Sequence, residues 1–135
     1  MVNQQFASAI HILAVLGRSG GIVGSRTVAA SIDTNPVVVR RLLLALRDAG
    51  LIRTCAGKRG GSGLAKPADQ ISLLDIYDAL DQRPLIGRRR RKVLKQCPVS
   101  CNMPRIMCEV SAAADRALRQ QLQSVTLRQI LRKIR

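Results

Sequence analysis

Apolar residues recur at helical spacing in the first part of the chain, between Phe6 and Gly17. This pattern predicts a first helix that ends in the glycine-containing stretch "GRSGG". Ser25 is expected to cap a short second helix that runs to about Ile32. The first part of the chain is therefore predicted to be helical.

A third helix is predicted in the stretch "NPVVVRRLLLALRDAG", where Asn35 is a favoured N-cap and Pro36 a favoured first helical residue. We expect one stripe of this helix to be buried, made of Val38, Leu42, Ala45 and Ala49. We expect the opposite stripe to face outward, made of Val37, Arg40, Arg41 and Leu44. Two short helices of this kind are typical of a helix-turn-helix. A small three-helix core with a solvated cationic face fits the periodicity equally well.

The residues after this helix predict a β-hairpin. "LIRTCAG" is a candidate strand, "KRGGSG" a glycine-rich turn and "LAK" a return strand. A basic hairpin directly after a helix-turn-helix is a wing, and Lys58 and Arg59 at its tip could reach a phosphate or the minor groove. The alternative is an ordinary surface hairpin. Nucleotide binding by a phosphate loop is discounted because the stretch lacks the lysine and hydroxyl residues that end such a loop.

The C-terminal half predicts three more helices. Ser72 and Asp75 form a capping box before a short helix, and a second capping box at Thr126 precedes the last one. Between them a long helix is expected from after Pro104 to about Ser124, where it would either join two subunits or fold back on its own core. The residues expected at the dimer interface are Met107, Val110, Ala114, Leu118 and Leu122.

These elements together predict a mainly α fold: a winged helix-turn-helix with a small two-stranded β wing and a long C-terminal dimerisation helix. We expect the winged domain to span residues 1–83, the basic linker and cysteine loop 84–103, and the dimerisation helix with the last short helix 104–135. No apolar stretch approaches the roughly twenty residues of a membrane span. The N-terminus is a poor secretory signal, so we expect a cytoplasmic protein with no membrane partner.

The net charge of +15 favours a polyanionic partner. The charge is uneven: residues 84–135 hold thirteen basic and two acidic residues, whereas the predicted helix-turn-helix lies before them. Charge alone therefore does not locate a nucleic acid within the chain. Phe6 and Tyr77 are the only aromatic residues, which argues against base stacking with single strands and favours double-stranded DNA. The run "RRRRK" at residues 88–92 would add affinity that is salt-sensitive and independent of sequence.

In this order and spacing the motifs resemble the Rrf-two-type family of bacterial winged helix-turn-helix regulators. The resemblance rests on "FASAIHILAVLG", "NPVVVRRLLLALRDAGLI", "GKRGGSGLAK", "ISLLDIYDAL" and "VTLRQIL", and it covers nearly the whole chain. The stretch "CPVSCN" is similar to a branch of that family whose members often carry "CPVG" there. The resemblance implies a homodimer held by the long helices, with the two recognition helices in successive major grooves of duplex DNA.

The candidate DNA-binding residues combine this resemblance with the outward stripe of the third helix. They are Ser25, Asn35, Pro36, Val37, Arg40, Arg41, Lys58 and Arg59. An arginine can bind the O6 and N7 atoms of guanine together, and a valine can contact the methyl group of thymine.

Three of the four cysteines, Cys97, Cys101 and Cys108, lie within twelve residues directly after the basic run. An iron–sulfur cluster or another metal is one hypothesis. Against it, the first spacing is narrower than in cluster-binding family members, and His11, the only histidine, is expected to be an ordinary helix residue. A thiol switch is the second hypothesis, because Cys97 and Cys101 could come within disulfide range and the basic run would stabilise a thiolate. In the third hypothesis, Cys108 and Cys55 are inert and behave as small buried hydrophobic residues.

The sequence as a whole predicts a dimeric, sequence-specific transcriptional regulator. Repression is expected, with a response to oxidants or reactive nitrogen through the cysteines. The main alternative is a basic protein that binds nucleic acid without sequence preference, which would lose all duplexes together as salt rises. An enzyme is not expected, because the sequence offers no convincing Ser/His/Asp set.

Overall fold

The chain divides into two units in the computed structural model, which describes residues 4–80, 86 and 92–134. The N-terminal unit comprises Met1–Asp81 and Leu122–Arg135. The second unit, here called the helical unit, comprises Gln82–Gln121. Most of the predicted basic run, residues 88–91, lies outside the described residues.

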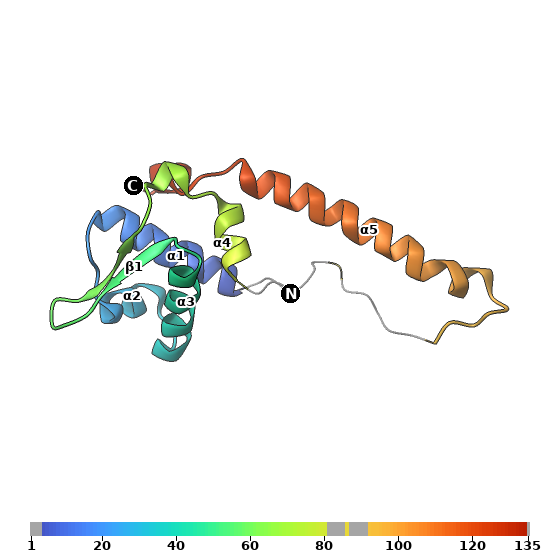
Figure 1. Cartoon of the computed structure of the whole chain (residues 1–135), viewed down its shortest axis with the longest axis horizontal. Helices are drawn as coiled ribbons and strands as arrows, with labels where there is room; N and C mark the ends of the chain where they lie inside the picture. Colours follow the sequence, from blue (N-terminus) through green and yellow to red (C-terminus); the bar gives the residue numbers. More distant parts are fainter. Residues whose placement is uncertain (1–3, 81–85, 87–91, 135) are drawn as a thin grey trace. The chain divides into compact units, whose positions relative to one another are not determined.

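Three helices, α1 (Gln4–Ser19), α2 (Ser25–Ile32) and α3 (Pro36–Asp48), form the first part of the N-terminal unit (Figure 1). The predicted first helix is confirmed. Its apolar face supplies completely buried residues to the core, among them Ile12 and Leu13. The chain leaves α1 at Gly20, whose φ of 73° lies in the left-handed region that favours glycine.

The second helix has a different N-cap from the one expected. Gly24 is the N-cap of α2 and makes no side-chain cap hydrogen bond, so Ser25 is the first helical residue. The prediction that Ser25 caps this helix is therefore wrong. The helix ends at Ile32, and Asp33 is its C-cap, with a φ of 55° in the left-handed region.

The buried face of α3 is rotated from the predicted one. Its buried residues are Val39, Leu42, Leu43 and Leu46. Of the expected stripe only Leu42 is buried; Val38 and Ala45 are half-buried and Ala49 is exposed. The expected N-terminus is confirmed, since the Asn35 side chain accepts a hydrogen bond of 2.9 Å from the backbone N–H of Val37.

A two-stranded antiparallel sheet follows α3, and it confirms the predicted hairpin. Strands β1 (Ile52–Cys55) and β2 (Gly61–Leu64) pair so that Ile52 lies opposite Leu64 and Cys55 opposite Gly61. The return strand begins earlier than expected, because the "GSG" residues belong to β2 rather than to the turn. Ser62 also exchanges two backbone hydrogen bonds with Val23, of 2.8 and 2.9 Å, which fasten the wing to the segment before α2.

Any side chain at Gly61 is expected to destabilise the junction between the wing and the segment before α2. A Cβ atom there would lie 2.2 Å from the backbone oxygen of Val23. Gly61→Ala should therefore lower the free energy of unfolding by about 1–3 kcal/mol, as measured by denaturant titration. Gly21→Ala is the matched control, because a Cβ at Gly21 meets nothing within 4 Å. Equal stability of the two variants would contradict the close packing.

The C-terminal end of the chain packs on the N-terminal unit. Helix α4 (Leu73–Ala79) follows the short 3-10 helix η1 (Ala68–Gln70), and α6 (Leu127–Arg132) is the last helix. Both predicted capping boxes are present, at Ser72 and at Thr126, and these two residues form a β-bridge with each other. Leu127 is completely buried in the N-terminal core. The last helix therefore belongs to the N-terminal unit and not, as expected, with the long helix.

The long helix α5 runs over Pro98–Gln123 and crosses the boundary between the units. It begins six residues before Pro104, so the expected start after Pro104 is wrong and Cys101 lies in its first turn rather than in a loop. Proline fits a first helical position best, and Pro98 occupies it. Among the residues that the structure describes, no helix is both long and apolar enough to cross a membrane.

Candidate nucleic-acid interface

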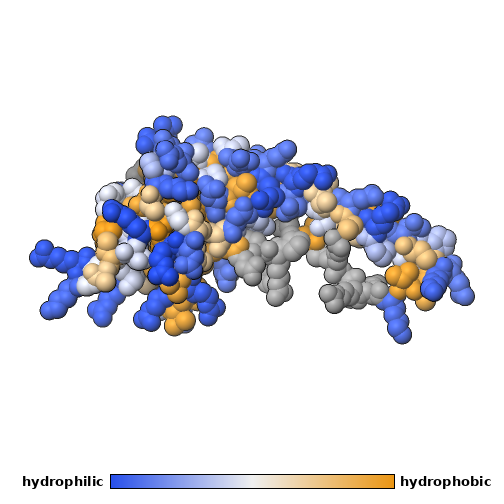
Figure 2. Space-filling view, viewed as in Figure 1, coloured by the Kyte–Doolittle hydropathy of each residue, from blue (hydrophilic) through white to orange (hydrophobic). Residues whose placement is uncertain are grey.

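The outer face of α3 carries the predicted recognition residues. Val37 is 56% exposed, and Arg40 and Arg41 are both exposed. Asn35 and Pro36 are exposed at the start of the same helix. Figure 2 shows hydrophilic side chains on both sides of an apolar patch at the lower end of α3. The face therefore offers cationic donors and an apolar contact side by side, as the major groove requires.

Basic residues outnumber acidic ones on α3, which favours an anionic partner. Asp48, its last residue, is the only acidic residue of the helix, and it lies 3.3 Å from Arg47 at the far end. Arg40 and Arg41 consequently have no carboxylate on their own helix within reach. Leu44 is 50% exposed and completes the outward stripe as predicted.

The wing presents its two basic residues at the tip. A backbone hydrogen bond of 3.0 Å from Gly60 to Gly57 closes a tight turn, and Lys58 and Arg59 are its two central residues. Both side chains are exposed. Cations on such a turn can reach phosphates that a helix in the groove does not touch.

The start of α2 adds a cation that the sequence reasoning missed. Ser25 is exposed at the first helical position, and Arg26 is exposed beside it. The available signal was the position of Arg26 at the start of a helix, because the backbone N–H groups there bind anions such as phosphate and an exposed arginine beside them can contact the same phosphate.

An exposed apolar stripe runs along the first half of α5. It consists of Val99, Met103, Ile106 and Val110, which are between 39% and 64% exposed. Their spacing of four, three and four residues places them on one helical face. The stripe shares only Val110 with the predicted interface: Met107, Ala114 and Leu118 are half-buried, and Leu122 is already buried within the chain.

The cysteines lie on the opposite face of α5 from this stripe. Cys97 immediately precedes the helix. Cys101 and Cys108 lie within the helix, four and eleven residues after Cys97, which is close to one and three helical turns. Cys101 is exposed, and Cys97 and Cys108 are half-buried. Cys55 is exposed on β1, so the hypothesis that it is a small buried hydrophobic residue is wrong.

Known proteins share both the sequence pattern and this arrangement. The sequence model of the Rrf2 family, described as "Iron-dependent Transcriptional regulator", matches residues 2–133. A relative from Bacillus subtilis (strain 168), named as the HTH-type transcriptional regulator YwnA, is 33% identical over 97% of each chain. The chain belongs to the Rrf2 family of transcriptional regulators.

Solved structures agree with this assignment. A crystal structure described as a DNA-binding protein is 31% identical, with a TM-score of 0.76 over 94% of this chain and 98% of that one. IscR of T. potens shares the fold at 20% identity, with a TM-score of 0.75 over 100% and 88% of the two chains. The chain is therefore a winged-helix Rrf2 regulator that binds DNA and is not an enzyme.

The Rrf2 family description raises the question whether the cysteines can hold iron. The helix places Cys108 about 10 Å along its axis from Cys101. Two sulfur atoms that bind one metal ion must each come within about 2.3 Å of it. No group of three His, Cys, Asp or Glu side chains with metal-binding geometry exists within the described parts of the chain. The arrangement does not fit a metal or cluster held by Cys97, Cys101 and Cys108 of one chain.

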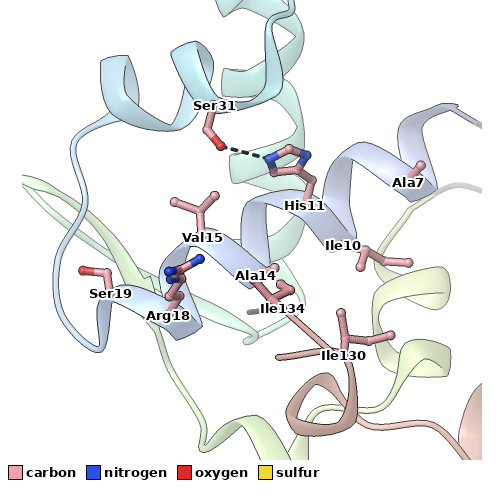
Figure 3. A pocket seen from close by; sticks show the side chains of 10 residues that line it. All are labelled: Ala7, Ile10, His11, Ala14, Val15, Arg18, Ser19, Ser31, Ile130 and Ile134. Carbon is pink, nitrogen blue, oxygen red and sulfur yellow. Dashed lines mark hydrogen bonds between the residues drawn. The ribbon is translucent and has the colours of Figure 1, made fainter. Parts of the chain in front are cut away.

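His11 lies in a groove of about 730 Å³ on the N-terminal unit of this Rrf2 protein (Figure 3). Its Nε2 atom is 2.9 Å from the hydroxyl oxygen of Ser31, and the rest of the lining is largely apolar, from α1 and from Ile130 and Ile134. Within the described residues no carboxylate is bonded to this imidazole, so the pair lacks the third member of a hydrolytic triad. His11 is an exposed helix residue, outside the cysteine segment.

Proposed function

We propose that this Rrf2 protein is a homodimeric, sequence-specific repressor that reads duplex DNA with α3 and the wing. The observation that supports it most strongly is the exposed strip of Val37, Arg40 and Arg41 on a helix whose other face is buried. A helix fixed in this way holds its outer side chains in a set direction, which base recognition requires.

The proposal that the protein is a dimer is supported by the apolar stripe on α5. Four large apolar side chains in one line are exposed to water in the single chain. A contiguous apolar surface of this kind is stabilised when a second copy covers it. The exposed alanines Ala113 and Ala117 continue the line and would allow a partner helix to approach closely. A symmetric dimer would present two α3 helices to two half-sites about one DNA turn apart.

The function is tested by selecting bound fragments from random duplexes at about 0.15 M salt. We expect enrichment of one sequence with two related half-sites. Recovery of fragments without any shared sequence would overturn the proposal and favour a basic protein that binds nucleic acid without sequence preference.

Replacing both wing cations should weaken every duplex to a similar degree. If Lys58 and Arg59 each contact one phosphate, the Lys58→Ala/Arg59→Ala variant should lower the slope of log affinity against log salt by about 1.8. The matched control is Arg128→Ala/Arg132→Ala, which removes two exposed cations from α6. A slope unchanged in the wing variant, or equally lowered in the control, would contradict phosphate contact by the wing.

For the signal, we propose an oxidant or a reactive nitrogen species that acts on the cysteines of the helical unit. Two thiols one turn apart, one of them exposed, support thiol chemistry. The competing sensor is a metal or iron–sulfur cluster at Cys97, Cys101 and Cys108. It predicts visible absorbance after anaerobic purification, and a coloured sample would overturn the thiol proposal.

A further inference from the structure

The start of α5 is fastened to the segment before it by two neighbouring side chains. The Cys101 thiol lies 3.4 Å from the backbone oxygen of Leu94 and 3.3 Å from that of Lys95, and donates to them. The hydroxyl oxygen of Ser100 accepts a hydrogen bond of 2.8 Å from the backbone N–H of Leu94. Leu94 is thus held at both its N–H and its carbonyl by the first turn of the helix.

The backbone of Cys97 makes hydrogen bonds both to the segment before α5 and to the first turn of the helix. Its backbone N–H donates to the Leu94 oxygen at 3.1 Å, and its own carbonyl accepts the first helical hydrogen bond, of 3.0 Å, from Cys101. Both thiols are free. Cys97 precedes α5 but is joined to Cys101 by a helical hydrogen bond, and residues four apart on a helix have Cβ atoms about 5–6 Å apart, whereas a disulfide needs about 3.5–4.5 Å. We therefore expect a disulfide between these cysteines to distort the first turn of α5.

We propose that Cys101 is the modification site of this protein, that Cys97 resolves it, and that the resulting disulfide unwinds the first turn of α5. The oxidant class is a low-molecular-weight disulfide. The Cys101 thiolate attacks one of its sulfur atoms and releases one thiol, which takes up a proton. The Cys97 thiolate then attacks the Cys101 sulfur and releases the second thiol. Two protein thiols are oxidised, and the small disulfide is reduced to two thiols.

Exposure distinguishes Cys101 from the other two thiols of its segment, because Cys97 and Cys108 are half-buried. The Cys101 S–H group also donates the hydrogen bonds to the backbone oxygens of Leu94 and Lys95, which hold the segment before α5 against the helix. Oxidation removes this donor and strains the first helical turn in a single event. Cys55, exposed on β1, has no comparable role in holding a helix terminus.

The inference is tested on the full chain with glutathione disulfide as the probe. Cleavage after Lys95 and Arg105 yields one peptide that holds both Cys97 and Cys101, and Cys108 falls in the next peptide. We expect the first peptide to lose the mass of two hydrogen atoms while Cys108 stays free. A disulfide that joins Cys108 or a second chain, or a stable mixed disulfide alone, would overturn the assignment.

Hydrogen exchange measures the structural consequence. On oxidation the amides that are hydrogen-bonded around the first turn of α5, those of Leu94, Cys97 and Cys101, should exchange roughly 5- to 30-fold faster, the effect of losing one or two hydrogen bonds. Cys101→Ser retains a donor and should exchange slowly with or without the probe. Cys101→Ala lacks the donor and should exchange faster even when reduced. An internal disulfide that leaves exchange unchanged would refute the unwinding.

The regulatory part of the inference rests on the proposed DNA-binding function, and the two can fail separately. Affinity of the reduced protein for a selected duplex tests the function. Oxidation should then weaken that affinity about 5- to 150-fold in the wild type and leave Cys101→Ser unchanged. Oxidation without any change in affinity would overturn the regulatory role, whereas absence of a preferred duplex for the reduced protein would overturn the function itself.

Discussion

Arg40→Ala is expected to lower affinity for a selected duplex by about 1–3 kcal/mol, because one bidentate contact to guanine is worth that much. The loss corresponds to roughly 5- to 150-fold in the dissociation constant. Arg40 is exposed on α3 beside Val37, and no carboxylate of the same helix neutralises it. The measurement is a titration of the selected duplex and of a scrambled duplex at the same salt concentration.

The difference between the two duplexes decides the role of Arg40. Loss of a base contact should weaken the selected duplex far more than the scrambled one. Arg128→Ala is the matched control, since it removes one exposed arginine from α6 and should weaken both duplexes slightly and equally. If Arg40→Ala behaves like this control, Arg40 contacts only phosphate, or nothing.

Val110→Glu is expected to convert the protein into a monomer. Val110 is 46% exposed in the middle of the helical unit, in line with Met103 and Ile106. In a symmetric dimer the substitution would place a carboxylate on both sides of the interface, and a buried unpaired charge costs several kcal/mol. The dimer dissociation constant should rise at least about 100-fold in sedimentation equilibrium.

DNA binding should fall together with dimerisation. A monomer reaches one half-site at a time and loses the gain of simultaneous engagement. Ala112→Glu is the matched control, because Ala112 is exposed on the opposite side of the same helix and glutamate is well tolerated in helices. A dimer that survives Val110→Glu, or dissociates equally in both variants, would place the interface elsewhere.

Local signals in the sequence predicted most of the N-terminal unit correctly. The first helix, the Asn35 cap, the hairpin and both capping boxes depend on neighbouring residues, and each is present. The exposed arginines of α3 were likewise predictable, because a charged side chain rarely occupies a core position.

Features that depend on distant contacts or on ambiguous patterns were not predictable. The run "VVVRRLLLAL" offers apolar residues at nearly every phase, so periodicity could not select Val39 and Leu43 over Val38 and Ala45. The "GSG" residues signal a turn, yet they form a strand because Val23 pairs with Ser62 from far along the chain. The docking of α6 depends on a bridge between Ser72 and Thr126, which no local pattern reveals.

The sequence placed the start of α5 incorrectly because it contains two prolines, each of which could be the first residue of the helix. Either Pro98 or Pro104 suits a first helical position, and the sequence does not distinguish them. The structure includes Pro104 within the helix, where it lacks the N–H that would bond the carbonyl of Ser100. Placing the start at Pro98 turns the cysteine loop into a helix terminus, which is why the Cys101 contacts could not be anticipated.

Methylation interference on a selected duplex is the most direct test of base reading by paired α3 helices. Methyl groups on guanine N7 lie in the major groove, and those on adenine N3 lie in the minor groove. We predict that N7 methylation blocks binding at two clusters about 34 Å apart, on one side of the duplex. Interference confined to adenine N3, or absent at every guanine, would contradict recognition through Val37, Arg40 and Arg41.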